Sequence, residues 1–356
     1  MKILAVITGM KSGGAERVMA TLCNELSKNN EVILLIFKNA ETDYYIDNNV
    51  KIIPGCIKNK NLFKAISFLK SQIEKYQPDI ILPFMTKSNI ISLIAREKSA
   101  FKCPVIICER ANPYYSSNLY KFLKKKIYPK SEGAVFQTKD AQEYYKDILK
   151  CESIVIRNPL SPDFKIKPYE GKREKKIVCT ARLSSEKNQQ LLIKTFAKIE
   201  DKYSDYKLEI YGEGPDKDKL QQLIDELNIG DKVKLMGRQK NIIECIKKAA
   251  IFVLPSNSEG MPNALLEAMA LGIPSIATDC PIGGSAILIK NKENGLLIPM
   301  NDEDKMIEAI EKIINDKDFA NKIGKNATKV VADFEPEKVC KEWEDYLIKV
   351  KENYHG

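Results

Sequence analysis

Two glutamates that could bind one ligand lie in the stretch PSNSEGMPNALLEAMALGIP, at positions 255–274. Glu259 precedes a predicted helix and Glu267 lies more than one turn inside it, so the two carboxylates can reach different parts of a ligand. An ordinary amphipathic helix with two solvated glutamates would give the same pattern. The rest of the chain has to decide between these two interpretations.

The start of this predicted helix favours a negatively charged ligand. Pro262 suits the first helical position, where a missing N–H costs nothing, and Gly272 with Pro274 ends the helix. Unpaired N–H groups and the positive end of the helix dipole attract anions, and phosphate is the anion that best fits such a site. The N–H groups concerned are those of Gly260, Met261 and Asn263.

A second set of charged residues follows the strand predicted at 176–181. Arg182 and Lys187 come after this strand, and ligands bind at the carboxyl ends of strands in open α/β sheets. An arginine offers a fixed fork of donors and a lysine a mobile point charge, so the two can converge on a diphosphate. Arg238 follows another predicted strand, at 233–236, in the same half of the chain.

The first half offers a glycine-containing loop and a charged pair. The loop TGMKSGGA, at 8–15, follows a buried strand predicted at 2–8 and contains Gly13 and Gly14. It lacks the GxGxxG spacing, so a dinucleotide-binding loop is not predicted. Glu109 and Arg110 follow a strand predicted at 104–108, where they form either part of a site or a surface salt bridge.

Composition excludes several classes of site. Nine cysteines are scattered without a CxxC pair, and the one histidine, His355, lies at the end. A zinc site, a disulfide framework and Ser-His-Asp or Cys-His catalysis are therefore not expected, and the cytosol is the expected compartment. No apolar run approaches the roughly 20 residues of a membrane span, and MKILAVITGM is expected to be a strand and not a cleaved signal.

Positive charge is concentrated in the first half. Residues 1–165 carry 26 Lys and Arg against 16 Asp and Glu, whereas the remainder is nearly balanced. This asymmetry fits an anionic partner, either a membrane surface, a phosphorylated acceptor or nucleic acid. A solvated basic face without any partner would look the same.

The segment PYYSSNLYKFLKKKIYPK, at 113–130, is rich in lysine and tyrosine. A helix that begins near Ser117 would place four apolar side chains on one face, with lysines around it. Such a helix can lie on anionic lipid, or it can be a packed helix with a solvated basic face. The apolar residues are Leu119, Phe122, Leu123 and Ile127, and the lysines are Lys121, Lys124, Lys125 and Lys126.

Strands and helices alternate along the whole chain, which predicts an α/β fold. At 356 residues the chain exceeds the usual size of one core, so two domains are expected. The charged segment 159–175 is the predicted linker between them. The predicted parts are a first domain at 1–162, a second at 163–335, and a final helix at 336–356 that packs back on the first domain.

Together these elements resemble the retaining nucleotide-sugar glycosyltransferases of family 4. The shared phrases are SGGAER at 12–17, VFQT at 135–138, IRNP at 156–159, ARLSSEKN at 181–188, YGEGP at 211–215 and SEGMPNALLEAMALGIP at 258–274. The last phrase contains the E-x7-E motif of that family, and the resemblance covers nearly the whole chain. It implies the GT-B fold, in which two Rossmann-like domains face each other across a cleft.

The resemblance also implies roles for individual residues. Arg182 and Lys187 would neutralise the donor diphosphate, Glu259 would bind hydroxyls of the donor sugar, and Glu267 would bind the ribose. Glu109 would orient the acceptor or accept its proton, because the chain lacks the histidine that many relatives place near the reacting sugar. The expected nucleotide-sugar site comprises Gly13, Gly14, Arg182, Lys187, Arg238, Glu259, Gly260, Met261, Pro262, Asn263 and Glu267.

The implied activity is transfer of a hexose or N-acetylhexosamine from a UDP-sugar to a growing bacterial glycan, one built on a polyprenyl diphosphate at the cytoplasmic face of the membrane. Because no DxD motif stands at a predicted strand end, metal-independent transfer without a cofactor is expected. Two alternatives stay open. One is a sugar-nucleotide epimerase or glycan phosphorylase of the same fold, and the other is a peripheral membrane or nucleic-acid-binding module without catalysis.

Overall fold

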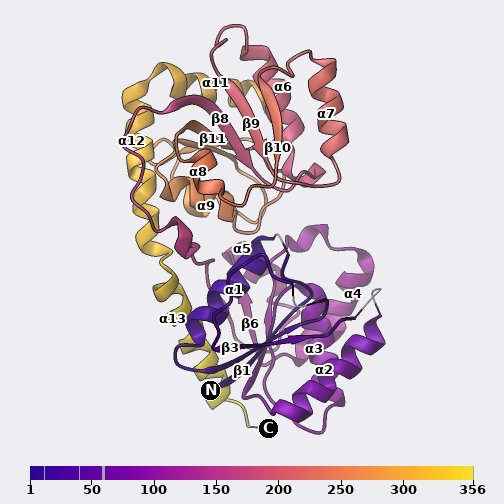
Figure 1. Ribbon diagram of the computed structural model, residues 1–356. Coiled ribbons are helices and arrows are strands. Elements are labelled where there is room, and N and C mark those ends of the chain that lie inside the picture. The colour runs from indigo at the N-terminus through magenta and orange to yellow at the C-terminus, as the bar shows by residue number, and fades with distance from the viewer. Residues whose placement is uncertain (12, 40, 58–60, 356) are drawn as a thin grey trace. The chain divides into compact units, whose positions relative to one another are not determined.

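The computed structural model describes residues 1–11, 13–39, 41–57 and 61–355, and the chain divides into two compact units (Figure 1). The first unit comprises Met1–Pro162 and Phe334–Gly356, and the second comprises Asp163–Asp333. The chain therefore leaves the second unit just before the limit at 335 that the sequence predicted.

The first unit is built on parallel strands. One sheet has the order β3-β2-β1-β4, and a second has the order β5-β6-β7. Bridges from Ile81 to Val105 and from Phe84 to Cys108 continue the parallel pairing from β4 to β5. The strands are β1 (Lys2–Ile7), β2 (Glu31–Ile36), β3 (Val50–Pro54), β4 (Ile80–Pro83), β5 (Ile106–Cys108), β6 (Gly133–Phe136) and β7 (Ser153–Val155).

Helices cover both faces of these strands, which explains why strands such as β1 are apolar almost throughout. One core cluster contains side chains of α1 (Gly14–Leu26) and α13 (Pro336–Glu352). The other contains side chains of α2 (Leu62–Tyr76), α3 (Thr86–Lys98) and α5 (Lys139–Tyr145), with α4 (Asn118–Ile127) packed against it. The first unit is therefore a three-layer α/β/α fold, as the sequence predicted.

The final helix packs on the first unit, which confirms the prediction. Trp343 of α13 is fully buried, and its ring lies 5.8 Å from that of Phe84 at the end of β4. The hydroxyl of Tyr346 donates to the carbonyl of Glu152 (2.8 Å) and accepts from the N–H of Ala134 (3.1 Å). Segments far apart in sequence thus share one core.

The second unit is a single parallel sheet with the order β10-β9-β8-β11-β12-β13. Its first strand is central, and the chain proceeds to one side through β9 and β10 before it returns to the other side at β11. The strands are β8 (Glu174–Thr180), β9 (Lys207–Tyr211), β10 (Val233–Gly237), β11 (Ala249–Leu254), β12 (Ser275–Thr278) and β13 (Leu296–Ile298). The order therefore reverses between β8 and β11, where such sheets bind ligands.

The helices of the second unit lie between its strands in sequence. They are α6 (Gln189–Ile199), α7 (Lys217–Glu226), α8 (Ile242–Ile246), α9 (Asn263–Ala270), α10 (Gly284–Leu288), α11 (Glu303–Asn315) and α12 (Lys317–Ala327), followed by a 3-10 turn at Thr328–Asp333. The sequence analysis missed α8 and α10 here and α5 in the first unit. Each of these helices is short, so two turns or fewer leave little periodicity to detect.

The buried Trp343 gives a test of the core of the first unit. Trp343→Ala is expected to lower the free energy of unfolding by about 3–5 kcal/mol, because it leaves a large cavity between α13 and β4. Urea denaturation followed by circular dichroism measures the change. Trp343→Phe is the control and should cost less, because the indole N–H has no hydrogen-bond partner among the described residues. Near-equal stability of Trp343→Ala and the parent would contradict this packing.

Candidate functional site

The candidate site in the second unit is formed by the two loops that leave β8 and β11. These strands pair in parallel, with Ile177 opposite Ile251 and Val178 opposite Phe252. Their carboxyl ends therefore lie side by side, and the loops at 181–188 and 255–262 start from neighbouring points. The fold brings together the two charged motifs that the sequence analysis could only place separately.

Hydrogen bonds join the two loops directly. The N–H of Asn257 donates to the carbonyl of Glu186 (2.8 Å), and Nδ2 of Asn188 donates to Oδ1 of Asn257 (3.3 Å). Asn188 has a φ of 49°, in the left-handed region that asparagine tolerates better than most residues. The sequence analysis did not assign a role to either asparagine, although Asn188 stands in the phrase ARLSSEKN that carried the resemblance.

Lys187 and Glu259 form an ion pair at the centre of this arrangement. Nζ of Lys187 lies 2.9 Å from Oε1 of Glu259, whose side chain is 9% exposed. The hydroxyl of Ser256 donates to the same carboxylate oxygen (2.7 Å), and Nζ of Lys187 also donates to the carbonyl of Ser258 (3.4 Å). The sequence analysis gave these two side chains to different parts of a ligand, whereas the structure pairs them with each other.

The negative charge of Glu259 also affects the pKa values of two nearby cysteine thiols. Burial, with a smaller effect of Glu259, raises the pKa of the Cys280 thiol to about 11 and that of the Cys179 thiol to about 12. Both thiols are therefore neutral at physiological pH. They are packing groups beside the site and not nucleophiles.

Of the two predicted arginines, Arg182 lies at the candidate site and Arg238 lies further along the sheet edge. The side chain of Arg182 is exposed and has no ion-pair partner in the part of the chain that the structure describes. Its carbonyl accepts from Nε2 of the buried Gln189 (2.9 Å), which holds the loop in place. Arg238 is exposed and follows β10, which β9 separates from β8.

The helix that carries the second glutamate begins one residue later than predicted. Pro262 has a ψ of 96°, which is extended, and so it is the N-cap of α9 and not its first helical residue. The carbonyl of Pro262 accepts from the N–H groups of Leu265 and Leu266 (3.1 Å each). Met261 and Pro262 are buried, Gly260 and Asn263 are half-buried, and Glu267 is only 6% exposed inside α9.

Gly284, the first residue of α10, allows the start of that helix to pack closely against this turn. A Cβ atom on Gly284 would lie 1.7 Å from the carbonyl oxygen of Gly260 and 3.2 Å from Cδ of Pro262. Only glycine fits such a close approach of two backbones. The sequence analysis assigned no role to the segment 279–284, and its paired glycines were the signal that was not used.

The glycine pair of YGEGP has a structural explanation of the same kind. A Cβ atom on Gly212 would lie 2.0 Å from the carbonyl oxygen of Ala181, and one on Gly214 would lie 2.1 Å from that of Leu183. These glycines let the end of β9 approach the end of β8. The segment that contains these glycines packs against the backbone of the loop that carries Arg182 and Lys187.

In the first unit, Gly13 and Gly14 stand at the start of α1. Gly13 is its N-cap with an extended backbone (φ −147°), and its N–H lies 2.9 Å from the hydroxyl of Tyr44. A Cβ atom on Gly13 would meet only the carboxylate end of Glu16, a flexible side chain. A ligand contact by these glycines stays a prediction, and Ser12, from the phrase SGGAER, lies outside the described residues.

Glu109 is buried within the first unit, with both carboxylate oxygens bound by neighbouring side chains. It accepts from Oγ1 of Thr86 (2.8 Å), Nδ2 of Asn89 (3.1 Å) and the hydroxyl of Tyr128, and it pairs with Nζ of Lys124 (3.3 Å). Burial and the charge of Glu109 raise the pKa of Tyr128 well above its usual value. An acceptor would have to displace one of these partners, so a role for Glu109 in proton transfer stays a prediction.

Arg110 points away from Glu109, so the alternative of a surface salt bridge between them is wrong. Its guanidinium carbon lies 4.5 Å from the ring centre of Phe84 and 5.3 Å from that of Trp343, and Nη1 donates to Oδ1 of Asn158 (2.7 Å). Burial lowers the pKa of Arg110 to about 10. The side chains of Glu109 and Arg110 thus make their contacts on opposite faces of the sheet.

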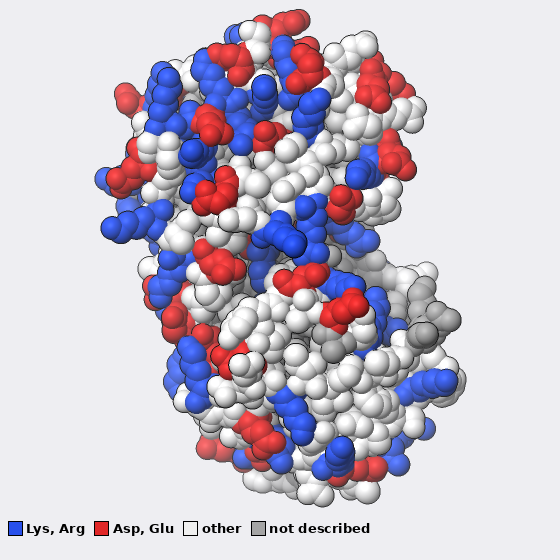
Figure 2. All heavy atoms as spheres, viewed as in Figure 1, with Lys and Arg blue, Asp and Glu red and all other residues white. Residues whose placement is uncertain are grey.

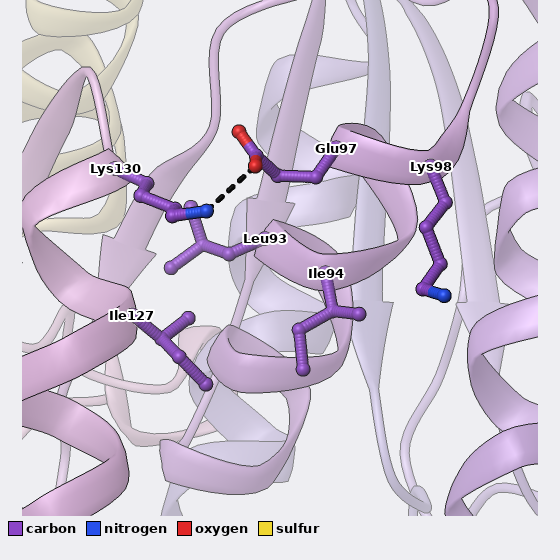
Figure 3. Close-up of a pocket in the computed structure, with 6 residues that line it drawn as sticks. All are labelled: Leu93, Ile94, Glu97, Lys98, Ile127 and Lys130. Atoms are coloured by element: carbon purple, nitrogen blue, oxygen red, sulfur yellow. Dashed lines mark hydrogen bonds and ion pairs between the residues drawn. The ribbon is translucent and has the colours of Figure 1, made fainter.

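A groove between α3 and α4 does not coincide with any of these residues. It is lined by Leu93, Ile94, Glu97, Lys98, Ile127 and Lys130, and an ion pair between Lys130 and Glu97 (2.6 Å) crosses its rim (Figure 3). Helix α3 begins at the carboxyl end of β4, so its last residues lie at the opposite edge of the sheet. No predicted site residue lines this groove.

Known proteins identify the family. The model of the family described as glycosyl transferases group 1 matches residues 162–330. An N-acetylgalactosamine-N,N'-diacetylbacillosaminyl-diphospho-undecaprenol 4-alpha-N-acetylgalactosaminyltransferase of Campylobacter jejuni is 30% identical over 371 residues, which cover 98% of this chain and 99% of that protein. The chain is a group 1 glycosyltransferase. A second enzyme of Campylobacter jejuni, named as a GalNAc-alpha-(1->4)-GalNAc-alpha-(1->3)-diNAcBac-PP-undecaprenol alpha-1,4-N-acetyl-D-galactosaminyltransferase, is 28% identical over 99% of both chains.

Solved structures confirm the fold of this glycosyltransferase. A sucrose-phosphate synthase from Thermosynechococcus elongatus is similar with a TM-score of 0.84 and 18% identity, over 98% of this chain and 99% of that one. HepE from Anabaena, solved in complex with UDP and glucose, is similar with a TM-score of 0.82 and 17% identity, over 98% and 100%. These structures have the GT-B fold, which confirms the fold class implied by the resemblance.

Gly284→Ala tests the geometry of the turn at 260–262. The added methyl group must push the backbone of Gly260 away, and a displacement on the order of 1 Å can cost about 100-fold in rate. The expected result is a glycosyltransferase that is folded by circular dichroism and has lost most of its transfer rate. Gly230→Ala is the control, because its Cβ would lie 3.8 Å from the nearest atom. Parent-like transfer by Gly284→Ala would contradict the described contact.

Proposed function

We propose that this glycosyltransferase moves a hexose or N-acetylhexosamine from a UDP-sugar to a growing glycan on a polyprenyl diphosphate. The ion pair of Lys187 with Glu259, next to the exposed Arg182, is the observation that carries the donor side of this proposal. The Campylobacter jejuni relatives, whose names specify undecaprenol-linked acceptors, support the acceptor side. HepE, solved with UDP and glucose, supports UDP as the nucleotide.

The donor diphosphate would open the ion pair. Its oxygens compete with Glu259 for Nζ of Lys187 and also face the fork of Arg182, so the lysine moves from one anion to another. Glu259 is thereby released to accept hydrogen bonds from hydroxyls of the donor sugar. Sugar recognition would then follow diphosphate binding, because Glu259 is engaged by Lys187 until that point.

The remaining proposed contacts follow from the same placement of the donor. The backbone of the turn at 260–263 would bind phosphate oxygens, Glu267 the ribose, and Arg238 the region of the nucleobase. Gly13 and Gly14 would contact the donor or acceptor from the first unit. Glu109 would act by holding α3 and α4 in place, since its oxygens already have partners.

Transfer would proceed with retention of the anomeric configuration. The bond from the anomeric carbon to the diphosphate breaks, and the acceptor oxygen forms its bond on the face that the diphosphate leaves. The acceptor proton passes to an oxygen of the departing diphosphate, so no separate base is required. Arg182 and Lys187 stabilise the negative charge that develops on that group, which is why we propose transfer without a metal ion.

Proton NMR of fresh product tests retention. With a UDP-α-sugar as donor, the new linkage is expected to give an α-anomeric signal before any mutarotation or hydrolysis. A β-linked product would refute the proposed geometry of attack. Transfer that requires a divalent cation, measured before and after treatment with a chelator, would refute the proposed role of the two cations.

Glu259→Gln tests whether the ion pair opens on donor binding. Lys187 then has no competing carboxylate, so UDP is expected to bind several-fold more tightly in a calorimetric titration. Transfer should nevertheless fall roughly 10- to 100-fold, because the charged hydrogen bond to the sugar is lost. If Glu259 does not compete with the diphosphate for Lys187, the Glu259→Gln variant will bind UDP as the parent does or more weakly, and this outcome would contradict the proposed opening of the ion pair.

Arg182→Ala combined with Lys187→Ala is the reference variant and should lose both UDP binding and transfer. Lys198→Ala is the matched control, because Lys198 lies in the same unit and pairs with Glu303 on the surface (3.2 Å). Near-normal transfer by the double variant would show that the assigned donor site is wrong.

We also propose that the enzyme works in peripheral contact with anionic lipid at the cytoplasmic face of the membrane. Within the described ranges, no helix is both long and apolar enough to cross a bilayer. An acceptor anchored by a polyprenyl chain stays at the membrane, so the enzyme has to reach it there. The excess of lysine in residues 1–165 supports an anionic surface as the contact.

A further inference from the structure

The basic excess of the first half forms no uniform basic face on the side of the molecule that Figure 2 draws. Figure 2 shows Lys and Arg side chains intermixed with Asp and Glu over the visible surface of the chain. A local feature can contact an anionic surface without such a face. The segment 110–131 is such a feature, because it contains six Lys and Arg residues and no Asp or Glu.

The orientation of α4 differs from the one that its apolar pattern predicts. Leu119 and Phe122 were expected to share one face with Leu123 and Ile127, either packed or on lipid, but Leu119 and Phe122 are 65% and 57% exposed. Leu123 and Ile127 do pack against the core of the first unit. The inward position next to them is taken by Lys124, whose side chain is only 2% exposed.

Buried contacts hold α4 in this orientation. Nζ of Lys124 pairs with Glu109 (3.3 Å) and donates to the hydroxyl of Tyr145 (2.7 Å) and to Oγ of Ser116 (3.0 Å). Rotating Leu119 or Phe122 inward would turn this ammonium group out of its buried partners and leave the Glu109 carboxylate without its cation. Breaking such a pair is costly, so the exposed apolar side chains are a fixed feature of the fold.

Exposed apolar side chains gather on this helix and the turn before it. Of the thirteen large hydrophobic side chains that are exposed in the described residues, five lie between 114 and 122. We define the α4 surface as these five residues with three lysines around them. It consists of Tyr114, Tyr115, Leu119, Tyr120 and Phe122, together with Lys121, Lys125 and Lys126.

We propose that the α4 surface is the membrane-docking site of this enzyme and that its partner is an anionic lipid surface. Leu119 and Phe122 would enter the acyl boundary, the tyrosines would lie at the headgroup level, and the lysines would pair with lipid phosphates. Exposed aliphatic and aromatic side chains with lysines around them fit a lipid boundary better than a nucleic acid, which calls for a groove along its backbone. The inference rests on the proposed membrane-linked acceptor but not on the identity of the sugar.

Vesicle co-sedimentation of the full chain tests the docking site. The parent is expected to bind vesicles of phosphatidylglycerol and phosphatidylethanolamine and to bind pure phosphatidylcholine weakly. Lys121→Gln, Lys125→Gln and Lys126→Gln together should weaken binding by roughly fivefold per lysine at low salt. Leu119→Ser with Phe122→Ser should weaken it by about tenfold or more.

A matched control uses α7 of the second unit and the residue that follows it. Leu227→Ser, Lys217→Gln and Lys219→Gln change one exposed apolar and two exposed basic side chains there and should leave vesicle binding unchanged. Phe122→Trp adds a local reporter, because the one native tryptophan, Trp343, is fully buried. Its fluorescence should shift to the blue on anionic vesicles, whereas Leu227→Trp should show no shift.

The outcomes separate this inference from the proposed activity. If the α4 variants transfer sugar normally to a water-soluble, short-chain acceptor but poorly to one in vesicles, both proposals hold. Vesicle binding that survives Leu119→Ser with Phe122→Ser, or a Phe122→Trp variant whose fluorescence does not shift, would overturn the docking site and leave the activity standing. Vesicle binding by a parent that transfers no sugar to either acceptor would overturn the activity alone.

Discussion

The parallel pairing of β8 with β11 is the constraint on which the donor site depends. Neighbouring strands lie about 4.8 Å apart, so two loops that leave adjacent carboxyl ends start side by side and contact each other. The helices that follow diverge, because α6 belongs to the core cluster on one face while α9 contacts β11, β12 and the turn at 328–333. The charged loops therefore lie at the carboxyl ends of the strands, where sheets of this kind bind ligands.

Two ion pairs between a lysine and a glutamate serve different purposes in this chain. Lys124 and Glu109 are both almost inaccessible, and each has several further hydrogen-bond partners, so this pair fixes the relation of helices to strands. The pair of Lys187 and Glu259 is more accessible, at 18% and 9%. An anion that reaches these loops can compete for Lys187, which makes this pair suited to exchange of partners and the other pair suited to rigidity.

Much of the fold could be predicted because it depends on patterns that repeat along the chain. Apolar strands such as β1 and periodic helices such as α11 can each be recognised from one short window of sequence. The short helices α5, α8 and α10 do not, because their existence depends on tertiary contacts. Pro262 was placed one position too far into α9 because a φ near −65° suits both the N-cap and the first helical residue, and ψ decides between them.

The sequence could predict which residues belong to the candidate site but not which of them contact each other. Spacing and residue type pointed to Arg182, Lys187 and Glu259, but no sequence pattern shows that two of them pair with each other. The same limit applies to Gly284, whose need for glycine comes from the carbonyl of Gly260 in a different loop. Interactions between segments that are distant in sequence are set by strand order, which has no local signal.

Counting charges along the sequence gives the net charge of the first half but not the places where its cations are exposed. Arg96 is nearly buried and pairs with Glu132 (2.7 Å), and Lys124 is buried on Glu109, so each of these pairs cancels within the protein and contributes little to the field outside it. What an anionic surface meets is the local density of unscreened cations. Charges more than about 8–10 Å apart are screened from each other at physiological salt. The lysines of α4 can attract an anionic surface together because they lie on one short helix. An acid-free segment with a fixed outward face is therefore more informative than the net charge of the half.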